Sequence, residues 1–315
     1  MKRIAHTWNY IKALLLCVLF VSCTAEDLAD CIGEARVYFR LTDQSVNPAT
    51  IDRIHLYVFN QNGFFVEEYT DNHISGFGPN YFIDIADLPA GNYRFIAWAG
   101  KDDALYTTTP AQFVKNATTI NEAVLMLEHA GNILSTPIKH IFHADISGTL
   151  LIIPTPQHYY MPLTQLSNTI NISTVGLPAF TDAFTFRITD NNCSYKFDRS
   201  FASHNHEPFT YIAHCTRDNA HQLHGTLNVL GLSANRHTPQ LQIVNESTGL
   251  PLYPVGDQSG DLIGLILSAT PNVNFNTTHT FDIVLTFTGD QTTGFDVSVS
   301  VNGWLVNDEN SELIE

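Results

Sequence analysis

Fourteen histidines in a chain of 315 residues raise the question of a metal site. His204 and His206 are two residues apart, so on a strand their side chains would point to one side and could share a cation. Three more follow at His214, His221 and His224. The segment is polar, however, and has no cysteine or carboxylate at a known zinc spacing, whereas a specific site needs a full ligand set. We therefore predict no metal ion and no other cofactor.

Motifs for catalysis are missing from the sequence. It has no Gly-x-Ser-x-Gly elbow, no Gly-x-x-x-x-Gly-Lys-Ser/Thr loop and no His-Glu-x-x-His helix. The paired acids Glu67-Glu68 and Asp102-Asp103 are adjacent, so on strands they would face opposite ways and form solvated surface. Two acids far apart in sequence can still meet, as in glycosidases. We predict no catalytic residue and a protein that is not an enzyme.

The first residues predict a secretory signal followed by a lipidated cysteine. A basic start precedes Ala13–Val21, an uncharged apolar run of nine residues. Such a run is typical of a signal peptide and is shorter than the roughly 20 residues that span a bilayer. Phe20-Val21-Ser22-Cys23 then resembles a lipobox, although Phe20 stands where leucine is usual. We predict cleavage between Ser22 and Cys23 and lipid attachment at Cys23; an ordinary signal peptide is the alternative.

The charge balance restricts the partners of the mature chain. Residues 1–22 carry three basic and no acidic residues, so their removal lowers the formal charge from −16 to −19. Nucleic acid and anionic lipid both require a basic surface, so we expect neither as a partner. We expect contact with the outer membrane through the lipid alone.

Cysteine use is consistent with export. Cys17 would leave with the signal and Cys23 would carry the lipid, so Cys31, Cys193 and Cys215 remain. A Cys193–Cys215 disulfide would suit an oxidising compartment and would leave Cys31 over. Spacing alone does not fix the pairing.

Alternation of apolar and polar residues predicts an all-β chain. Asn60–Gly63 predicts a hairpin, because Asn-Gly tolerates the positive φ of tight turns. By the same logic, the Pro and Gly of Leu88–Asn92 predict that the chain doubles back there. Helical periodicity is weak, and 119–127 is the one stretch where we expect a helix. Strands are predicted at 35–41, 54–59, 64–69, 81–85, 93–99, 168–174, 184–189, 223–230, 239–245, 262–268, 280–288 and 295–301.

Short strands over two domain lengths indicate tandem β-sandwiches. The segment 145–162, with Pro154, Pro156 and Pro162, reads as the link, which places the boundary near residue 158. The predicted division is a signal peptide at 1–22, a lipidated tether at 23–32, an N-terminal β-sandwich at 33–158 and a C-terminal β-sandwich at 159–315.

The exposed or buried state of the aromatic residues bears on ligand binding. Trp98 and Trp304 could stack on sugar rings, but both occur in strand-like contexts where packing is the commoner use. Tyr159 and Tyr160 fall in the Pro-rich segment. We expect an interdomain contact there rather than a ligand platform.

Several stretches, spread over both ends of the mature chain, resemble a known family. They are the lipobox, Cys31 with the Val-x-Phe strand after it, Ile54–Val66, Leu88–Gly100, Ser247–Leu250 and Val301–Trp304. Each alone would be a generic hairpin or turn. Together they resemble the fimbrial anchor family of Bacteroides-type bacteria, the lipoproteins that anchor minor and major fimbriae.

The resemblance implies two transthyretin-like β-sandwich domains in a protein that roots a fimbrium in the outer membrane and limits its length. Glu26-Asp27 is similar to the signal that exports such lipoproteins to the outer face. Fimbrial shaft or accessory subunits would join by strand addition, in which backbone hydrogen bonds supply affinity. Asn274–Thr278 departs from a Leu-Asp-Arg-Glu-like segment of the family, which leaves the partner subunit open.

We therefore predict a lipid-anchored protein of the cell outer membrane, exposed at the surface as part of the fimbrium. Its function would be to anchor the fimbrium and to assist its assembly or length control. The alternative is a surface adhesin or glycan-binding lipoprotein on the same fold.

Overall fold

The computed structural model describes residues 33–129, 131–179, 181–202, 207–290 and 294–306. The predicted cleavage and lipid sites, Ser22 and Cys23, lie outside these ranges, as do Cys31, His204 and His206. The roles assigned to them therefore stay predictions.

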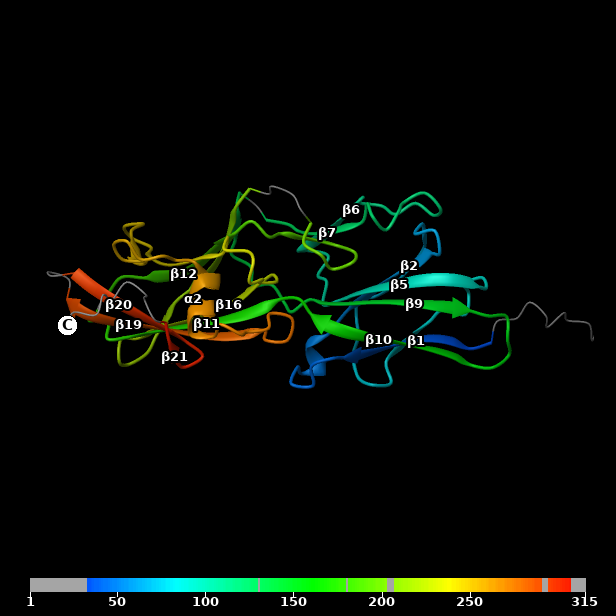
Figure 1. Cartoon of the computed structure of the whole chain (residues 1–315), viewed down its shortest axis with the longest axis horizontal. Helices are drawn as coiled ribbons and strands as arrows, with labels where there is room; N and C mark the ends of the chain where they lie inside the picture. The colour runs from blue at the N-terminus through cyan, green and yellow to red at the C-terminus, as the bar shows by residue number, and fades with distance from the viewer. Residues whose placement is uncertain (1–32, 130, 180, 203–206, 291–293, 307–315) are drawn as a thin grey trace, which may run out of the picture.

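Strands make up about half of the described chain and helices very little of it, which confirms the predicted all-β fold class. The largest sheet has seven strands in the order β3 (Phe65–Asp71), β2 (Ile54–Asn60), β5 (Gly91–Ala99), β9 (Phe142–Leu150), β10 (Gln157–Gln165), β1 (Ala35–Leu41) and β4 (Phe82–Asp84). β9 and β10 pair at one end only, through Thr164–His143 and Gln165–Phe142. The sheet therefore folds at this corner into two layers, β3-β2-β5-β9 and β10-β1-β4 (Figure 1).

An apolar core fills the space between these two layers. The period of two decides which side chains enter it, because successive residues of a strand point to opposite faces. In β1, Val37 and Phe39 are buried, whereas Arg36, Tyr38 and Arg40 lie on the outer face. The inward residues pack with those of the other strands, among them Leu56, Val58, Phe95, Ala97, Phe142, Met161 and Leu163.

β2 and β5 are buried on both faces. Their second face, with Tyr57 and Trp98, is covered by Phe197 and by a small sheet of β13 (Ser194–Lys196), β7 (Val124–Leu127) and β6 (Tyr106–Thr109). Strands buried on both faces are continuously apolar, which explains the runs IHLYVF and FIAWA.

The C-terminal half contains two further sheets. One has the order β15 (Thr216–Arg217), β16 (Leu223–Val229), β11 (Asn168–Val175), β19 (Thr280–Asp290), β20 (Gly294–Val301) and β21 (Trp304–Leu305). The other has the order β18 (Pro251–Tyr253), β17 (Gln240–Asn245), β12 (Phe184–Asp190), β14 (Phe209–His214) and β8 (Ile133–Leu134).

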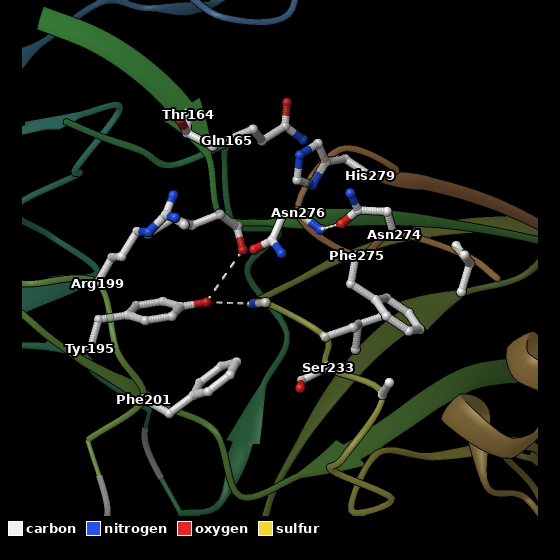
Figure 2. Close-up of a pocket in the computed structure, with 15 residues that line it drawn as sticks. Thr164, Gln165, Tyr195, Arg199, Phe201, Ser233, Asn274, Phe275, Asn276 and His279 are labelled. Carbon is white, nitrogen blue, oxygen red and sulfur yellow. Dashed lines mark hydrogen bonds between the residues drawn. The ribbon is translucent and has the colours of Figure 1, made fainter.

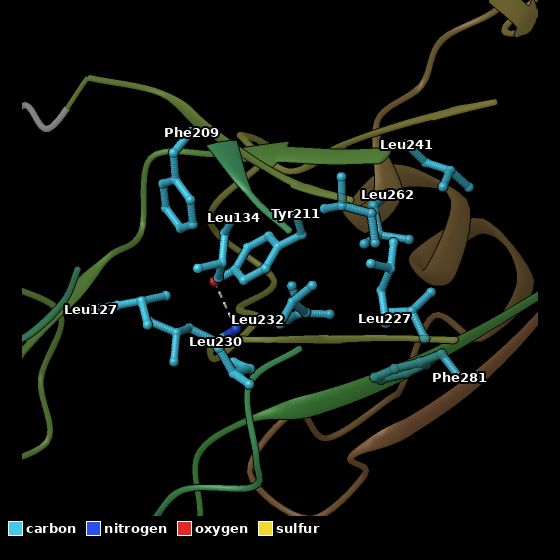
Figure 3. Close-up of a cluster of buried hydrophobic side chains, with 14 of the residues drawn as sticks. Leu127, Leu134, Phe209, Tyr211, Leu227, Leu230, Leu232, Leu241, Leu262 and Phe281 are labelled. Atoms are coloured by element: carbon cyan, nitrogen blue, oxygen red, sulfur yellow. Dashed lines mark hydrogen bonds between the residues drawn. The ribbon is translucent and has the colours of Figure 1, made fainter. Parts of the chain in front are cut away.

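Figure 3 shows the core between these two sheets. Leu227 and Phe281 from the first sheet meet Tyr211 and Leu241 from the second, all of them buried. The Tyr211 hydroxyl accepts a hydrogen bond from the Leu230 amide at 3.2 Å, so its polar atom is satisfied inside the core.

The predicted strand at 262–268 is wrong, since α2 (Leu262–Ala269) is a helix. Asp261 caps it, because its carboxylate accepts a hydrogen bond from the Ile263 amide at 3.1 Å. The expected helix at 119–127 is also wrong: that stretch forms turns and then β7. No helix among the described residues is long and apolar enough to cross a membrane.

Of the two predicted turns, one forms a hairpin. Asn60–Gly63 joins the paired strands β2 and β3, and Gly63 has φ of +79°. Leu88–Asn92 does not make a hairpin, because β4 pairs with β1 while β5 pairs with β2 and β9. This turn instead carries the chain from one layer of the folded sheet to the other.

The reading of 145–162 as a link is wrong, because β9 continues to Leu150 and β10 begins at Gln157. Residue 158 lies inside β10. Strand pairing also crosses that position: β7 pairs with β13, and β8 pairs with β14. Segments that precede residue 158 are thus built into sheets with segments that follow it. The division into 33–158 and 159–315 remains a prediction.

Cys193 and Cys215 are free thiols, which contradicts the predicted disulfide. Cys193 follows the last residue of β12, and the Cys215 amide bonds the carbonyl of Phe184, the first residue of that strand. The two cysteines therefore lie at opposite ends of a seven-residue strand. At about 3.3 Å per residue, this separation exceeds the Cα–Cα limit of about 7 Å for a disulfide. Burial raises the pKa of both thiols, that of Cys215 to about 12.

Candidate functional site

The chain starts its fold at one end of an elongated molecule, which we call the proximal end and define by Gly33 and the loop 151–156 (Figure 1). The Gly33 amide donates to the Ile153 carbonyl at 2.9 Å. A Cβ at residue 33 would lie 2.7 Å from the Pro154 carbonyl oxygen, so only glycine allows this approach. The path toward Cys23 thus leaves the fold beside this loop.

The outer face of β4-β1-β10 carries a ladder of rings and guanidinium groups. Tyr38 stacks on Tyr160, with ring centroids 5.4 Å apart. Arg40 covers the Tyr160 ring at 4.2 Å, and Arg36 covers the Phe82 ring at 4.1 Å. These contacts are cation–π interactions that occupy ring faces a sugar would need.

The interdomain contact expected at Tyr159 and Tyr160 is wrong. Tyr159 lies 5.5 Å from Phe95, centroid to centroid, within the core of the seven-stranded sheet, and its hydroxyl donates to the Thr149 carbonyl. Tyr160 points outward into the ladder.

The hairpin of β19 and β20 forms the opposite end, which we call the distal end (Figure 1). β21 pairs with only Ser300 and Val301 of β20, so residues 294–299 have no strand on their outer side among the described residues. Two local groups bond this edge: Gln258 Nε2 donates to the Val297 carbonyl and the Val306 amide to the Val299 carbonyl.

Trp304 and Leu305 project beside the end of this edge and are 65% and 61% exposed. The expectation that Trp304 serves packing is therefore wrong, whereas Trp98 is fully buried as expected. A groove of about 340 Å³ lies between the β20 edge and α2, lined by Val297, Val299 and Leu265 among others. A strand edge with no neighbouring strand, beside a groove that side chains of a partner can enter, is the geometry that strand addition uses.

The edge strand β3 of the seven-stranded sheet differs from the β20 edge, because charged side chains and loops protect it. It carries Glu67 and Glu68, and Lys115 pairs with Glu67 at 2.5 Å. Its first residue, Phe65, is already bonded through both backbone groups, to Asn116 and Thr118. Charges and covering loops are the usual means of preventing pairing at an edge.

The paired carboxylates do not all form solvated surface. His55 is buried and lies 3.0 Å from Glu68 and 3.5 Å from Asp103, while Lys101 is 2.5 Å from Asp103. Burial raises the pKa of Glu68, but hydrogen bonds from His55 and Tyr57 outweigh this and the net shift is downward. The cluster holds β2, β3 and the segment after β5 together, and no local pattern in the sequence predicts it.

The structure does not gather the remaining predicted histidines. His214 pairs with Glu246 at 2.9 Å and His224 with Asp218 at 3.0 Å. His221 lies in a turn with φ of +63°. In the part of the chain that the structure describes, no three His, Cys, Asp or Glu side chains are arranged to hold a metal ion.

A pocket of about 370 Å³ lies between the ends, where β10 leads into β11 (Figure 2). Tyr195 forms its floor: the hydroxyl accepts from the Gly231 amide and donates to the Leu166 carbonyl. Burial raises the pKa of Tyr195 to about 12, so the hydroxyl stays protonated at neutral pH. This single group links β13 to segments that follow β10 and β16.

The pocket wall combines polar and apolar side chains and contains no carboxylate, although the chain has 31 acidic and 15 basic residues. Arg199 borders it and, among the described residues, its guanidinium has no ion pair or hydrogen bond. Asn274 and Asn276, from the segment that departs from the family, border it too. Volumes near this one suit small ligands, and amides with a guanidinium suit a hydroxylated or anionic molecule.

Comparison with known proteins places the chain in a family. A model of the fimbrillin-A associated anchor proteins Mfa1 and Mfa2 matches residues 28–310, so the chain belongs to this family. This confirms the resemblance found in the sequence. No curated protein matches the chain significantly.

Solved structures show the same fold. The fimbrial anchor protein Mfa2 from Porphyromonas gingivalis superposes with a TM-score of 0.68 at 21% identity, covering 87% of this chain and 99% of that one. A proposed polysaccharide-binding protein from Bacteroides thetaiotaomicron gives 0.73 at 18% identity, with 88% and 99% covered. A proposed adhesin from Bacteroides ovatus superposes with a TM-score of 0.71 at 17% identity, covering 89% of this chain and 96% of that one. The family model thus shows that the chain belongs to a family of fimbrillin-associated anchor proteins, and the solved structures show that it shares their fold.

Proposed function

We propose that the chain is an outer-membrane lipoprotein, acylated at Cys23, that anchors a fimbrium to the cell surface and assists its assembly or length control. The proposal involves no catalytic step. The observation that carries it is the placement of two features at opposite ends of an elongated molecule in the anchor family. The chain leads toward Cys23 from the proximal end, and an open strand edge lies at the distal end.

The distal edge is where we propose that a fimbrial subunit joins. The Val297 and Val299 carbonyls both point away from β19, since they bond Gln258 and Val306. Backbone groups alternate along a strand, so the amides and carbonyls of 297 and 299 are the ones that an added strand would meet. The Gln258 side chain is a local group that such a strand can displace.

A comparison of cells with and without the protein tests the anchoring role. Cells that lack the chain are expected to release fimbriae into the medium, and the fimbriae are expected to vary more in length. Electron microscopy gives the lengths, and immunoblotting of cell and medium fractions gives the retained share. Fimbriae that stay attached at normal length in its absence would refute the proposal.

Glycan binding is the second candidate function, and the pocket beside Tyr195 favours it. Arg199, Asn274 and Asn276 present donors that sugar hydroxyls or a sugar carboxylate can use. A glycan array probed with the purified chain would show saturable binding that Arg199→Ala removes. The matched control is Tyr160→Ala, which alters the ladder on the outer face and should leave binding unchanged. An array without saturable binding rejects this function.

A further inference from the structure

We propose that the loop 151–156 is a membrane-contacting tip, which dips into the bilayer that holds the acyl chains of Cys23. The inference rests on the proposed lipid anchor and adds a second, non-covalent contact to it. Four observations carry it: the position of the loop, its composition, the state of its backbone and the charges around it.

Position places the loop beside the tether. Residue 33 is fixed against it by the Gly33–Ile153 hydrogen bond, and the Gln157 amide bonds the Glu34 carbonyl at 2.7 Å. Ten residues, 23–32, separate the lipid site from Gly33. Fully extended, they reach at most about 35 Å, so the proximal end stays near the membrane surface.

Composition sets the loop apart in an acidic protein. From Leu150 to Gln157 the sequence LLIIPTPQ carries no charge. Leu151 and Ile152 are 49% and 48% exposed and project from the fold instead of packing in its core. Neighbouring exposed aliphatic side chains at the end of a molecule are typical of a surface that meets an apolar partner.

The amides and carbonyls of Leu151 and Ile153, on either side of the exposed Ile152, are already paired. The Gln157 side chain accepts from the Leu151 amide and donates to the Leu151 carbonyl, both at 2.9 Å. The Ile153 amide bonds the Leu151 carbonyl at 3.1 Å, and the Ile153 carbonyl bonds Gly33. This pairing lowers the cost of bringing their backbone groups to the low-dielectric boundary of a bilayer.

Charges beside the loop do not oppose this contact. Glu34 is the acidic residue that leads into β1, and it pairs with Arg36 at 2.9 Å and contacts His158 at 2.9 Å. The negative charge at the membrane-facing end is thereby balanced. The occupant we infer is the acyl and headgroup boundary of the lipid layer.

Quenching by brominated lipid tests the tip. The mature lipidated chain, which begins at Cys23 and so lacks Trp8, would be reconstituted into phosphatidylcholine vesicles whose acyl chains carry bromine. A Trp304→Phe background leaves only buried Trp98 as native emission. Emission from Ile152→Trp is expected to be at least about twofold lower in brominated vesicles than in vesicles without bromine, because side chains at the interface reach about 5–10 Å into the boundary of headgroups and acyl chains. The control is Leu250→Trp in the β17–β18 turn, 66% exposed, which should not be quenched.

The outcomes separate the tip from the anchor. If the chain floats with the vesicles and residue 152 is quenched more than residue 250, both proposals stand. If the chain floats with the vesicles but residues 152 and 250 are quenched equally, the proposed membrane contact of the loop is overturned and the proposed lipid anchor stands. A chain that does not float overturns the lipid anchor, and the tip with it.

Discussion

The two ends of the molecule both expose apolar side chains, but they differ in backbone. At the proximal end, the amides and carbonyls beside Leu151 and Ile153 are paired within the loop and with Gly33. At the distal end, β21 covers only Ser300 and Val301 of the β20 edge, and the described groups that bond Val297 and Val299 on the outer side are Gln258 and Val306. A paired backbone suits lipid, which offers no hydrogen bonds, whereas an open edge suits another strand.

This difference indicates how one anchor protein could bind a membrane at one end and a fimbrial subunit at the other. Load must pass from a membrane at one end to a subunit at the other, so the part between them has to be continuous. Strands β7 and β8 precede residue 158 yet pair with β13 and β14. The pairing, together with the shared core around Phe197, connects the ends through sheet and core rather than through a flexible link.

The largest effect is expected from removing the lipid. An ordinary cleavable signal peptide in place of residues 1–22, combined with Cys23→Ala, should move nearly all of the protein from the membrane to the soluble fraction. Each buried methylene contributes about 0.8 kcal/mol, so loss of the acyl chains far outweighs what Leu151 and Ile152 contribute. Immunoblots of the two fractions give the answer, with the chain that keeps its own residues 1–22 and Cys23 as the control. Undiminished membrane association would contradict the assigned roles of the two ends.

Phe197→Ala should weaken the part between the ends. Phe197 is fully buried, 4.9 Å from Tyr57 and 5.9 Å from Trp98 between ring centroids. Its truncation should lower the free energy of unfolding by about 3–5 kcal/mol, because it leaves a cavity where strands from both halves meet. Urea unfolding measures this, with the outer-face residue Phe82→Ala as a control that should cost about 1 kcal/mol or less. We call this region around Phe197, where strands from both halves meet, the junction. Equal losses of unfolding free energy in the two variants would show that the junction is no more tightly packed than the surface.

Val297→Pro tests the open edge directly. Proline removes the outward N–H that an added strand would use, so sheared fimbriae should bind the variant at least about tenfold more weakly. Val297→Ala is the matched control: it loses buried side-chain volume but keeps the N–H, and it should bind normally. Unfolding curves of both variants establish that each is folded. If both variants bind alike, the partner strand does not add to β20.

The sequence predicts strands well where one face alone is buried. In β1 and β19 the core residues alternate with outward ones, and both were located by period two. The run at Leu262–Ala269 has no such alternation, and a mostly apolar run of eight residues fits a strand or a buried helix equally. The Asp261 cap decides for the helix, and that signal was overlooked.

Pairing between strands that are far apart in the sequence produces no local sequence pattern. The sites depend on such pairing, so they were harder to predict than the individual strands. Nothing near residue 124 indicates that β7 pairs with β13, and the prolines at 154 and 156 read as a link when they form the proximal loop. The pocket beside Tyr195 combines segments that follow β10, β13, β16 and α2. Only the departure at Asn274–Thr278 pointed to one of its walls.

The smallest effect is an acid sensitivity that should arise at the junction and not at either end. His143 is buried, and its Nε2–H donates to the Phe197 carbonyl at 2.9 Å. Burial lowers the pKa of His143 to about 4, against about 6.5 in the unfolded chain. Between these values the unfolded chain binds more protons, so stability falls as the pH falls, by about 2 kcal/mol from pH 7 to pH 5.

Carboxylates with lowered pKa, such as Glu68, lose stability in the same direction at lower pH, so a variant is needed to isolate His143. His143→Gln keeps a donor for the Phe197 carbonyl and removes the titrating ring. Urea unfolding gives the free energy of unfolding at pH 7 and at pH 5. Between these two values, this free energy should fall by about 2 kcal/mol less in His143→Gln than in the parent chain. Identical losses in the two proteins would mean that acid weakens some other part of the molecule, and that the junction is as insensitive to pH as the ends it connects.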